Sequence, residues 1–355
     1  MSKEELSPAT FIGVQGDDII SFGSGQPDLP PPTEAYKILP NYRDFKYGLI
    51  QGMAELRQGL TAQYPNSTAD SFVITNGASE ALDLVLRVIA RKNSQSGNKV
   101  LMARPYYYSY PNMVRFAGME PIFTDTIDGR IDFDDFAKKV GDCKAVIVNS
   151  PSNPTGRVEA TETLKKIEQL TSELGVYVLS DEVYKDLIYV RENYLIKGPH
   201  VVTINSFSKT YGMCGFRVGY MWSLDQELVE EVIGIKTHTS MNTNILGQEM
   251  ALAAIGVPSD FAEKQLEIWR HRRDLIYQGL IDLGFDLWKP EGAFYVMPQV
   301  EDPRNFVWDL FQRYKVITYL GDWFGSPDRI RLSYALDVDK IKQGLDRIDK
   351  FLRQR

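Results

Sequence analysis

Short apolar runs alternate with amphipathic stretches between about residue 70 and residue 205. The compact apolar runs, each bounded by turn residues, lie at 72–74, 100–102, 145–148, 176–179 and 201–204. Continuous apolar runs of this length are typical of strands in a parallel sheet that is covered on both faces. Between the runs, apolar residues recur at helical spacing, for example in 78–89 and 161–174. The alternation predicts an α/β domain with a mostly parallel sheet covered by helices.

The pattern changes after about residue 245. A long charged amphipathic stretch at 261–283 precedes short apolar runs at 293–296 and 330–333, and the chain ends in an amphipathic helix. The prolines near residue 30 indicate an extended segment that crosses between domains. We therefore expect a large domain over residues 40–245. A smaller α+β domain would combine residues 1–39 with residues 246–355.

Polar residues follow four of the apolar runs, at 75–79, 149–154, 180–182 and 206–209. Open parallel sheets bind their ligands outside the carboxyl ends of the strands. Because all four clusters fall at such ends, we expect them to converge on a single ligand.

The most informative cluster contains Lys209, in the run Ser206-Phe207-Ser208-Lys209, with Arg217 shortly after it. An amine attacks a carbonyl only when it is unprotonated, so a reactive lysine needs surroundings that lower its pKa. The Arg217 guanidinium and the hydroxyls of Ser206 and Ser208 suit a phosphate group. This stretch predicts an aldehyde cofactor that carries a phosphate and forms an imine with Lys209. A polar loop with a solvated lysine is the alternative.

Composition narrows the class of protein. With 355 residues, of which 43% are hydrophobic and 25% charged, the chain can bury a sizeable core as a globular protein. A net charge of −7 disfavours nucleic acid or an anionic membrane as the main partner. Two cysteines are too few for a disulfide framework, and the three scattered histidines suggest no metal site. The first residues lack the basic and then apolar pattern of a secretory signal. We expect a cytoplasmic protein.

The motifs between about Ser24 and Ala335, in their order and spacing, resemble the pyridoxal-phosphate-dependent aminotransferases of class I and II, which share the aspartate aminotransferase fold. The resemblance implies a transaminase that moves the amino group of an amino acid to a 2-oxo acid through pyridoxal 5′-phosphate. Lys209 would carry the cofactor and then move a proton as general base and acid.

The resemblance also assigns residues around the cofactor ring. Asp181 matches the aspartate that pairs with the pyridine nitrogen, which keeps the ring an electron sink. Tyr184 and Asn153 match residues that bond to the ring's phenolic oxygen. Tyr107 matches an aromatic ring stacked on the cofactor face, although Tyr106 and Tyr108 beside it leave the choice open. Taken singly, a helix cap, a core tyrosine and an Asn-Pro turn would explain Asp181, Tyr184 and Asn153.

The phosphate is assigned to the start of a helix and to the lysine loop. Gly77-Ala78-Ser79 opens a helix, whose free N–H groups and positive dipole end attract an anion. By resemblance, the phosphate-binding residues are Ala78, Ser79, Ser206, Ser208 and Arg217. Ordinary helix capping is an alternative for Ala78 and Ser79.

Two further assignments concern a partner chain and the substrate. Tyr47 matches a tyrosine that reaches the phosphate of the neighbouring subunit, which implies a homodimer with shared active sites. Arg331 matches the arginine that binds the substrate α-carboxylate in bidentate fashion, helped by Asn153 and the backbone at Gly25. No arginine matches one for a side-chain carboxylate, so a dicarboxylic substrate is neither predicted nor excluded.

Other functions remain as alternatives. A lyase, such as a C–S lyase, or a decarboxylase would keep the cofactor and break a different bond at Cα. A non-catalytic ligand-binding relative would belong to a different class, but such regulators also carry a DNA-binding module, for which the sequence gives no sign. An NAD-dependent dehydrogenase is disfavoured because no Gly-x-Gly-x-x-Gly run follows an early strand.

Overall fold

The computed structural model describes residues 3, 6–14, 16–92, 97–190, 193–258 and 260–354. Its main sheet has seven strands in the order β2-β10-β9-β8-β7-β3-β4. Their bounds are Phe72–Thr75 (β2), Lys99–Ala103 (β3), Glu120–Thr124 (β4), Cys143–Asn149 (β7), Tyr177–Asp181 (β8), Val201–Ser206 (β9) and Gly219–Ser223 (β10). All neighbouring strands run parallel except β10, which is antiparallel to both β2 and β9. The predicted mostly parallel sheet is confirmed.

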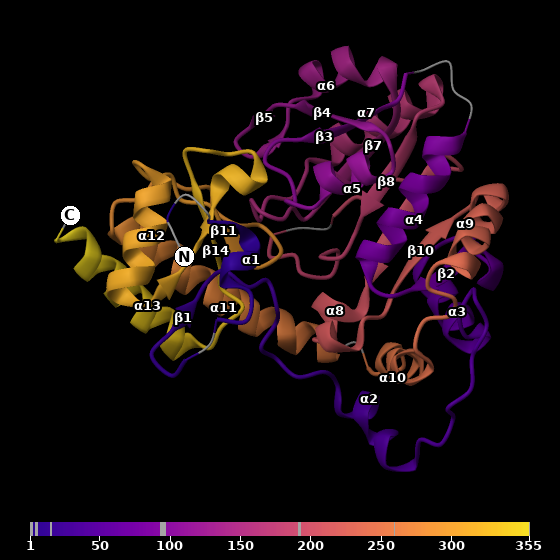
Figure 1. Ribbon diagram of the computed structural model, residues 1–355, viewed down its shortest axis with the longest axis horizontal. Coiled ribbons are helices and arrows are strands. Elements are labelled where there is room, and N and C mark those ends of the chain that lie inside the picture. Colours follow the sequence, from indigo (N-terminus) through magenta and orange to yellow (C-terminus); the bar gives the residue numbers. More distant parts are fainter. Residues whose placement is uncertain are drawn as a thin grey trace.

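Helices cover both faces of this sheet (Figure 1). One face packs on α4 (Ala78–Arg91), α5 (Tyr110–Phe116) and α9 (Gln226–His238) through a shared apolar cluster. The other face packs on α6 (Phe133–Lys139) and α7 (Thr161–Leu174). Successive strand residues such as Leu101 and Met102 belong to opposite clusters, as the alternation of side chains along a strand requires. Double coverage explains why these strands read as continuous apolar runs.

A smaller part of the molecule, formed by residues 6–29 and 260–352, joins the two ends of the chain. The strand β1 (Ile20–Ser21) pairs in parallel with β12 (Val316–Ile317), which ties the N-terminal segment to the C-terminal elements. The strands β11 (Tyr295–Val296), β14 (Ile330–Ser333) and β13 (Tyr319–Leu320) form an antiparallel sheet. Three helices, α11 (Asp260–Asp282), α12 (Pro303–Tyr314) and α13 (Val338–Leu352), complete this part. Figure 1 shows α1 and β1, in indigo, beside these orange and yellow elements.

The predicted domain boundaries stay a prediction, and the packing of two helices bears on them. The helix α10 (Ile245–Ile255) packs on both α2 (Thr33–Lys37) and α3 (Ala54–Leu60), and Ala35 and Met250 share one apolar cluster with Ile74 of β2. Boundaries at 39/40 and 245/246 would separate these helices from the sheet against which they bury their apolar residues. We keep the two-domain division as a proposal and assign 33–37 and 245–255 to the large domain.

The remaining elements are short. They are α1 (Pro8–Phe11), β5 (Thr126–Ile127), β6 (Arg130–Ile131), α8 (Phe207–Thr210) and 3₁₀ turns at Leu39–Asn41, Thr61–Gln63, Ala69–Ser71, Val140–Asp142, Cys214–Phe216 and Gly321–Phe324. Within the described residues, every helix is too short or too polar to cross a membrane.

Candidate active site

A cavity of about 690 Å³ lies where the carboxyl ends of the central strands meet the smaller part of the molecule. Residues from all four predicted polar clusters line it, so the clusters do converge. The predicted site residues in its wall are Gly25, Ala78, Ser79, Tyr107, Asn153, Asp181, Tyr184, Ser206, Ser208, Lys209, Arg217 and Arg331. Tyr47 is the one predicted site residue that is absent from this wall.

Lys209 lines the cavity from the short helix α8. The helix begins directly after β9, where the Ser206 hydroxyl accepts a hydrogen bond from the Ser208 backbone N–H at 3.3 Å. The Lys209 Nζ donates to the carbonyl oxygen of Gly25 at 2.7 Å, across a sequence separation of 184 residues. The amine therefore points across the cavity toward the N-terminal segment.

Asp181 ends β8 and presents a buried carboxylate to the cavity. Its Oδ2 accepts a hydrogen bond from the Tyr110 hydroxyl at 2.5 Å, and its Oδ1 accepts one from the Val183 backbone N–H at 3.2 Å. Burial raises the pKa of Asp181, while these two bonds and the charge of Lys209 act in the opposite direction. A cationic ring nitrogen placed here would gain a desolvated anionic partner.

One end of the cavity combines the Arg217 guanidinium with the N-terminus of α4, and we call it the anion-binding end. Gly77 caps α4 with φ +79°, and a Cβ at this position would collide with the Arg217 guanidinium. Only glycine both adopts this conformation without strain and lets Arg217 approach so closely. Arg217 itself donates to the Cys214 carbonyl at 3.0 Å. With Ser206 and Ser208 in the same wall, this end suits a phosphate.

An ion pair between Glu80 and Lys236 stabilises the turn next to this end of the cavity. The Glu80 carboxylate accepts hydrogen bonds from the Asn76 backbone N–H at 2.7 Å and from the Lys236 Nζ at 2.8 Å. Lys236 is fully buried. The Glu80 bonds hold the turn that leads into α4, and Lys236 compensates the negative charge close to the anion-binding end.

The opposite end of the cavity centres on Arg331, a buried residue of β14. Its Nη1 donates to Asn153 Oδ1 at 3.0 Å, and its Nη2 donates to the Gly23 carbonyl. Its Nε has no hydrogen-bond partner among the described residues. Arg329 points elsewhere, because it donates to the Met297 carbonyl at 2.8 Å. Arg331 is thus the guanidinium of this strand that a carboxylate in the cavity can reach.

Of the three adjacent tyrosines considered for stacking on the cofactor, only two line the cavity. Tyr107 and Tyr108 both line the cavity, so the structure leaves two candidates for stacking on a bound ring. Tyr106 instead stacks on Phe123, with ring centroids 5.0 Å apart, and is absent from the cavity wall. Tyr184 forms a hydroxyl–hydroxyl hydrogen bond of 2.8 Å with Tyr295, and burial raises the pKa of Tyr184.

Tyr47 lies on the surface, with 82% of its area exposed. Its neighbours Phe45 and Leu49 are also exposed. Within one chain, this tyrosine does not contribute to the cavity.

Four functional candidates were given no individual role from the sequence, although Asn149 belongs to the predicted cluster 149–154: Gly23, Tyr110, Asn149 and Tyr295. Asn149 Oδ1 accepts a hydrogen bond from the Asn153 backbone N–H at 2.8 Å, and its Nδ2 donates to the Asp181 carbonyl at 3.0 Å. Its place at the end of β7 was the signal that could have identified it. Tyr110 and Tyr295 carried no such signal, because each falls in a run of aromatic or apolar residues.

Comparisons with known proteins agree with this geometry. The family model described as "Aminotransferase class I and II" matches residues 17–348. An aspartate aminotransferase of Bacillus subtilis is 29% identical over 387 aligned positions, covering 98% of this chain and 97% of that protein. The structure of aspartate aminotransferase from Thermotoga maritima superposes with a TM-score of 0.89 at 30% identity, covering 99% of this chain and 97% of that one. An aromatic aminotransferase from Pyrococcus horikoshii gives 0.88 at 26% identity, with 98% and 99% coverage.

Proposed function

The chain belongs to the family of class I and II aminotransferases, and from this membership we propose how its residues move an amino group from an amino acid to a 2-oxo acid. The enzyme depends on pyridoxal 5′-phosphate, which supplies, when bound, an aldehyde for the substrate amine and a ring that withdraws electrons from Cα. The observation that carries the proposal is the single cavity shared by Lys209, Asp181, Arg217 and Arg331. A lyase or decarboxylase reaction is not favoured, because the relatives are aminotransferases.

The cavity fits this cofactor on its own geometry. We assign the phosphate to the end beside Gly77, where a side chain would block Arg217. The groups proposed to hold it are Ala78, Ser79, Ser206, Ser208 and Arg217. Asp181 would hold the proton on the ring nitrogen, Asn153 and Tyr184 would donate hydrogen bonds to the ring oxygen, and Tyr107 would cover one face.

Lys209 is the proposed proton carrier. Its Nζ already reaches the Gly25 carbonyl across the cavity, so the free amine can approach a Cα hydrogen of a substrate held between Gly25 and Arg331. The neutral amine accepts that proton as a general base, and the resulting ammonium returns it at a second atom as a general acid. Tyr184 is proposed to assist through its hydroxyl, which Tyr295 orients.

Arg331 is proposed to hold the α-carboxylate of the substrate. Nη1 is oriented by Asn153 and Nη2 by the Gly23 carbonyl, and the guanidinium carbon lies 4.5 Å from the Tyr295 ring centroid and 4.6 Å from that of Phe324. This packing excludes water and fixes the plane of the guanidinium. A carboxylate that binds here is oriented as well as neutralised.

We propose a substrate with an uncharged side chain. The cationic side chains that line the described cavity are Lys209, Arg217 and Arg331, and each already has a role above. Ile12, Tyr108 and Tyr319 add apolar and aromatic surface to the same wall. Some relatives are named as aspartate aminotransferases and one as an aromatic aminotransferase. The lining favours the aromatic class.

The proposal also includes a homodimer and a cytoplasmic location. Phe45, Tyr47 and Leu49 expose 85%, 82% and 59% of their areas, which supports burial against a second copy. In such a dimer, Tyr47 would reach the phosphate of the neighbouring site. The cytoplasmic location is supported by the sparse use of cysteine, because both Cys143 and Cys214 are free.

The decisive experiment is a pair of half-reactions with the purified holoenzyme and a panel of amino acids. Phenylalanine or tyrosine should convert the bound cofactor to its amine form, seen as a loss of aldehyde absorbance, and a 2-oxo acid should restore it. Aspartate should react with a kcat/KM at least about 10-fold lower, since each cationic side chain in the described cavity lining already has another role. Repeated turnover that releases ammonia or carbon dioxide when no 2-oxo acid is supplied as amino acceptor would instead indicate a lyase or a decarboxylase.

A further inference from the structure

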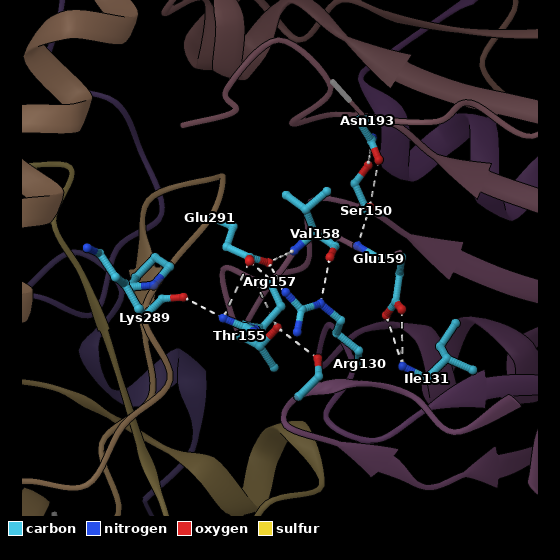
Figure 2. Close-up of polar contacts among 12 residues, drawn as sticks. Arg130, Ile131, Ser150, Thr155, Arg157, Val158, Glu159, Asn193, Lys289 and Glu291 are labelled. Atoms are coloured by element: carbon cyan, nitrogen blue, oxygen red, sulfur yellow. Dashed lines mark hydrogen bonds and ion pairs between the residues drawn. The ribbon is translucent and has the colours of Figure 1, made fainter. Parts of the chain in front are cut away.

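A network of ion pairs and hydrogen bonds joins the loop that carries Asn153 to the segment that precedes β11 (Figure 2). At its centre is Glu291, whose carboxylate accepts two hydrogen bonds from Arg130 Nη2, at 2.6 and 2.5 Å. The same carboxylate accepts a hydrogen bond from the Val158 backbone N–H at 3.2 Å. Arg130 also donates from Nε to the Val158 carbonyl at 2.9 Å. One carboxylate therefore ties three distant segments together, and we call this network the Glu291 clasp.

The backbone reinforces the clasp. The N–H groups of Glu291 and Gly292 both donate to the Gly156 carbonyl, at 2.7 and 2.9 Å. Gly156 has φ +67°, and a Cβ there would lie 2.6 Å from the Tyr295 carbonyl oxygen. The two segments are thus packed so closely that a shift of one displaces the other.

Asn153 is carried on the same small loop. The loop is closed by hydrogen bonds from the Ser152 N–H to the Arg157 carbonyl and from the Gly156 N–H to the Ser152 carbonyl, both at 2.9 Å. Asn153 lies within this closed turn, and its Oδ1 accepts the hydrogen bond from Arg331. Displacement of the loop at Val158 therefore moves the group that orients Arg331.

Glu291 also stands four positions before Tyr295, which lines the cavity and bonds to Tyr184. Arg157 is the third charged member of the network: its Nη1 lies 3.7 Å from Glu291 Oε1 and donates to the Lys289 carbonyl at 2.9 Å. The Arg130 and Glu291 side chains are about one quarter and one fifth exposed. In this pair both carboxylate oxygens accept from one guanidinium nitrogen and the two side chains are largely shielded from solvent, so the pair constrains geometry more than a surface ion pair does.

We propose that Glu291 is a positioning residue for the substrate-carboxylate site, holding the Asn153 loop so that Asn153 and Arg331 meet in the geometry that receives a carboxylate. This inference rests on the proposed role of Arg331. Glu291 itself lies outside the cavity wall and touches neither substrate nor cofactor.

The test compares Glu291→Gln with wild-type holoenzyme. Glutamine keeps the shape and can still accept from the Val158 N–H, but it loses the charge that binds Arg130. We expect the KM of the best amino acid in the panel to rise about 10-fold, as for loss of a charge-assisted pair worth about 1.4 kcal/mol. The dissociation constant of the corresponding amine-free acid, 3-phenylpropionate for phenylalanine, should rise equally in calorimetric titration. Both kcat and cofactor affinity should stay within about 3-fold, since no transition-state contact is removed.

Two further variants make the result specific. Arg130→Gln should reproduce the KM rise, and the double variant should add little to either single change, because both remove one interaction. Glu34→Gln, which breaks an exposed ion pair with Lys37 on α2, should leave every constant unchanged.

The outcomes distinguish an error in the proposed role of Arg331 from an error in the proposed role of Glu291. If Arg331→Leu leaves binding of the amine-free acid intact, the carboxylate role of Arg331 is wrong, and the inference falls with it. If Arg331→Leu abolishes that binding while Glu291→Gln lowers only the melting temperature, the clasp is merely structural. If the double variant instead raised the KM by the product of the two single effects, Glu291 and Arg130 would act independently. That result would also contradict the proposal.

Discussion

At the anion-binding end of the cavity, Ser206, Ser208 and Arg217 come from one stretch of chain, residues 206–217. At the other end, Arg331, Asn153 and Gly23 come from three segments separated by more than a hundred residues each. The first end is shaped by a turn and a helix start, the second by the contact between the two parts of the molecule.

The two ends also differ in what supports them. Glu80 and Lys236 brace the turn before α4, entirely within the large part of the molecule. The Glu291 clasp braces Asn153 across the junction between the large and the smaller part. We infer that cofactor binding depends on contacts within the large part of the molecule, whereas substrate binding depends on how the two parts fit together. Substitutions can therefore separate the two properties.

The largest effect is expected between the two ends, at Lys209. Lys209→Ala should lower kcat by about 10⁴-fold or more, because both the covalent anchor and the proton carrier are lost. Since neither end of the cavity is altered, the variant should still fold and bind pyridoxal phosphate weakly. Borohydride reduction of the wild-type enzyme followed by peptide mapping should place the cofactor on Lys209. A label on another lysine would refute the assignment.

A pair of arginine variants tests the separation of the ends directly. Arg331→Leu should lower kcat/KM about 100-fold or more, as for loss of one partner of a buried charge pair, with cofactor affinity nearly unchanged. Arg217→Leu should do the reverse, weakening cofactor binding about 10- to 100-fold through loss of charged hydrogen bonds. Equilibrium dialysis of the cofactor and steady-state kinetics measure the two properties. If both variants impaired both properties equally, the proposed division would be wrong.

The smallest effect concerns the pH dependence of stability that the buried carboxylate of Glu159 contributes. Burial raises the pKa of Glu159 from 4.5 to about 7, although its carboxylate accepts hydrogen bonds from the Ile131 N–H. Because the folded-state pKa is the higher one, its contribution to stability is fully present below about pH 4.5 and is lost as the pH rises through 7. The free energy of unfolding should therefore fall between pH 5 and pH 8, by at most about 3 kcal/mol for this group.

Glu159→Gln should remove that part of the pH dependence in urea unfolding. Glu182, whose pKa burial also raises to about 7, lies beside Asp181 and away from the clasp. Glu182→Gln should flatten the stability profile similarly. An unchanged stability profile in Glu159→Gln would show that the group stays ionised in the fold.

Much of the sheet could be predicted because its strands are covered on both faces. The five apolar runs correspond to β2, β3, β7, β8 and β9. Two strands escaped prediction. β4 contains Glu120 and Pro121 and forms the sheet edge, so its pattern is mixed. β10 begins two residues after Arg217, so the sequence pattern assigned its first residues to the loop that carries Lys209.

The sequence by itself determined five strands of the main sheet, the polar clusters at their ends and the contiguous lysine loop, because strand periodicity and local turns are fixed by residues close together in the chain. Tertiary structure alone decided that Tyr110 bonds to Asp181, that α10 packs with the sheet and that Glu291 braces the Asn153 loop. These contacts join segments separated by about 70 to 180 residues, and their formation depends on how whole elements pack. No local pattern of apolar and polar residues encodes that packing, because many partners could satisfy the same buried face.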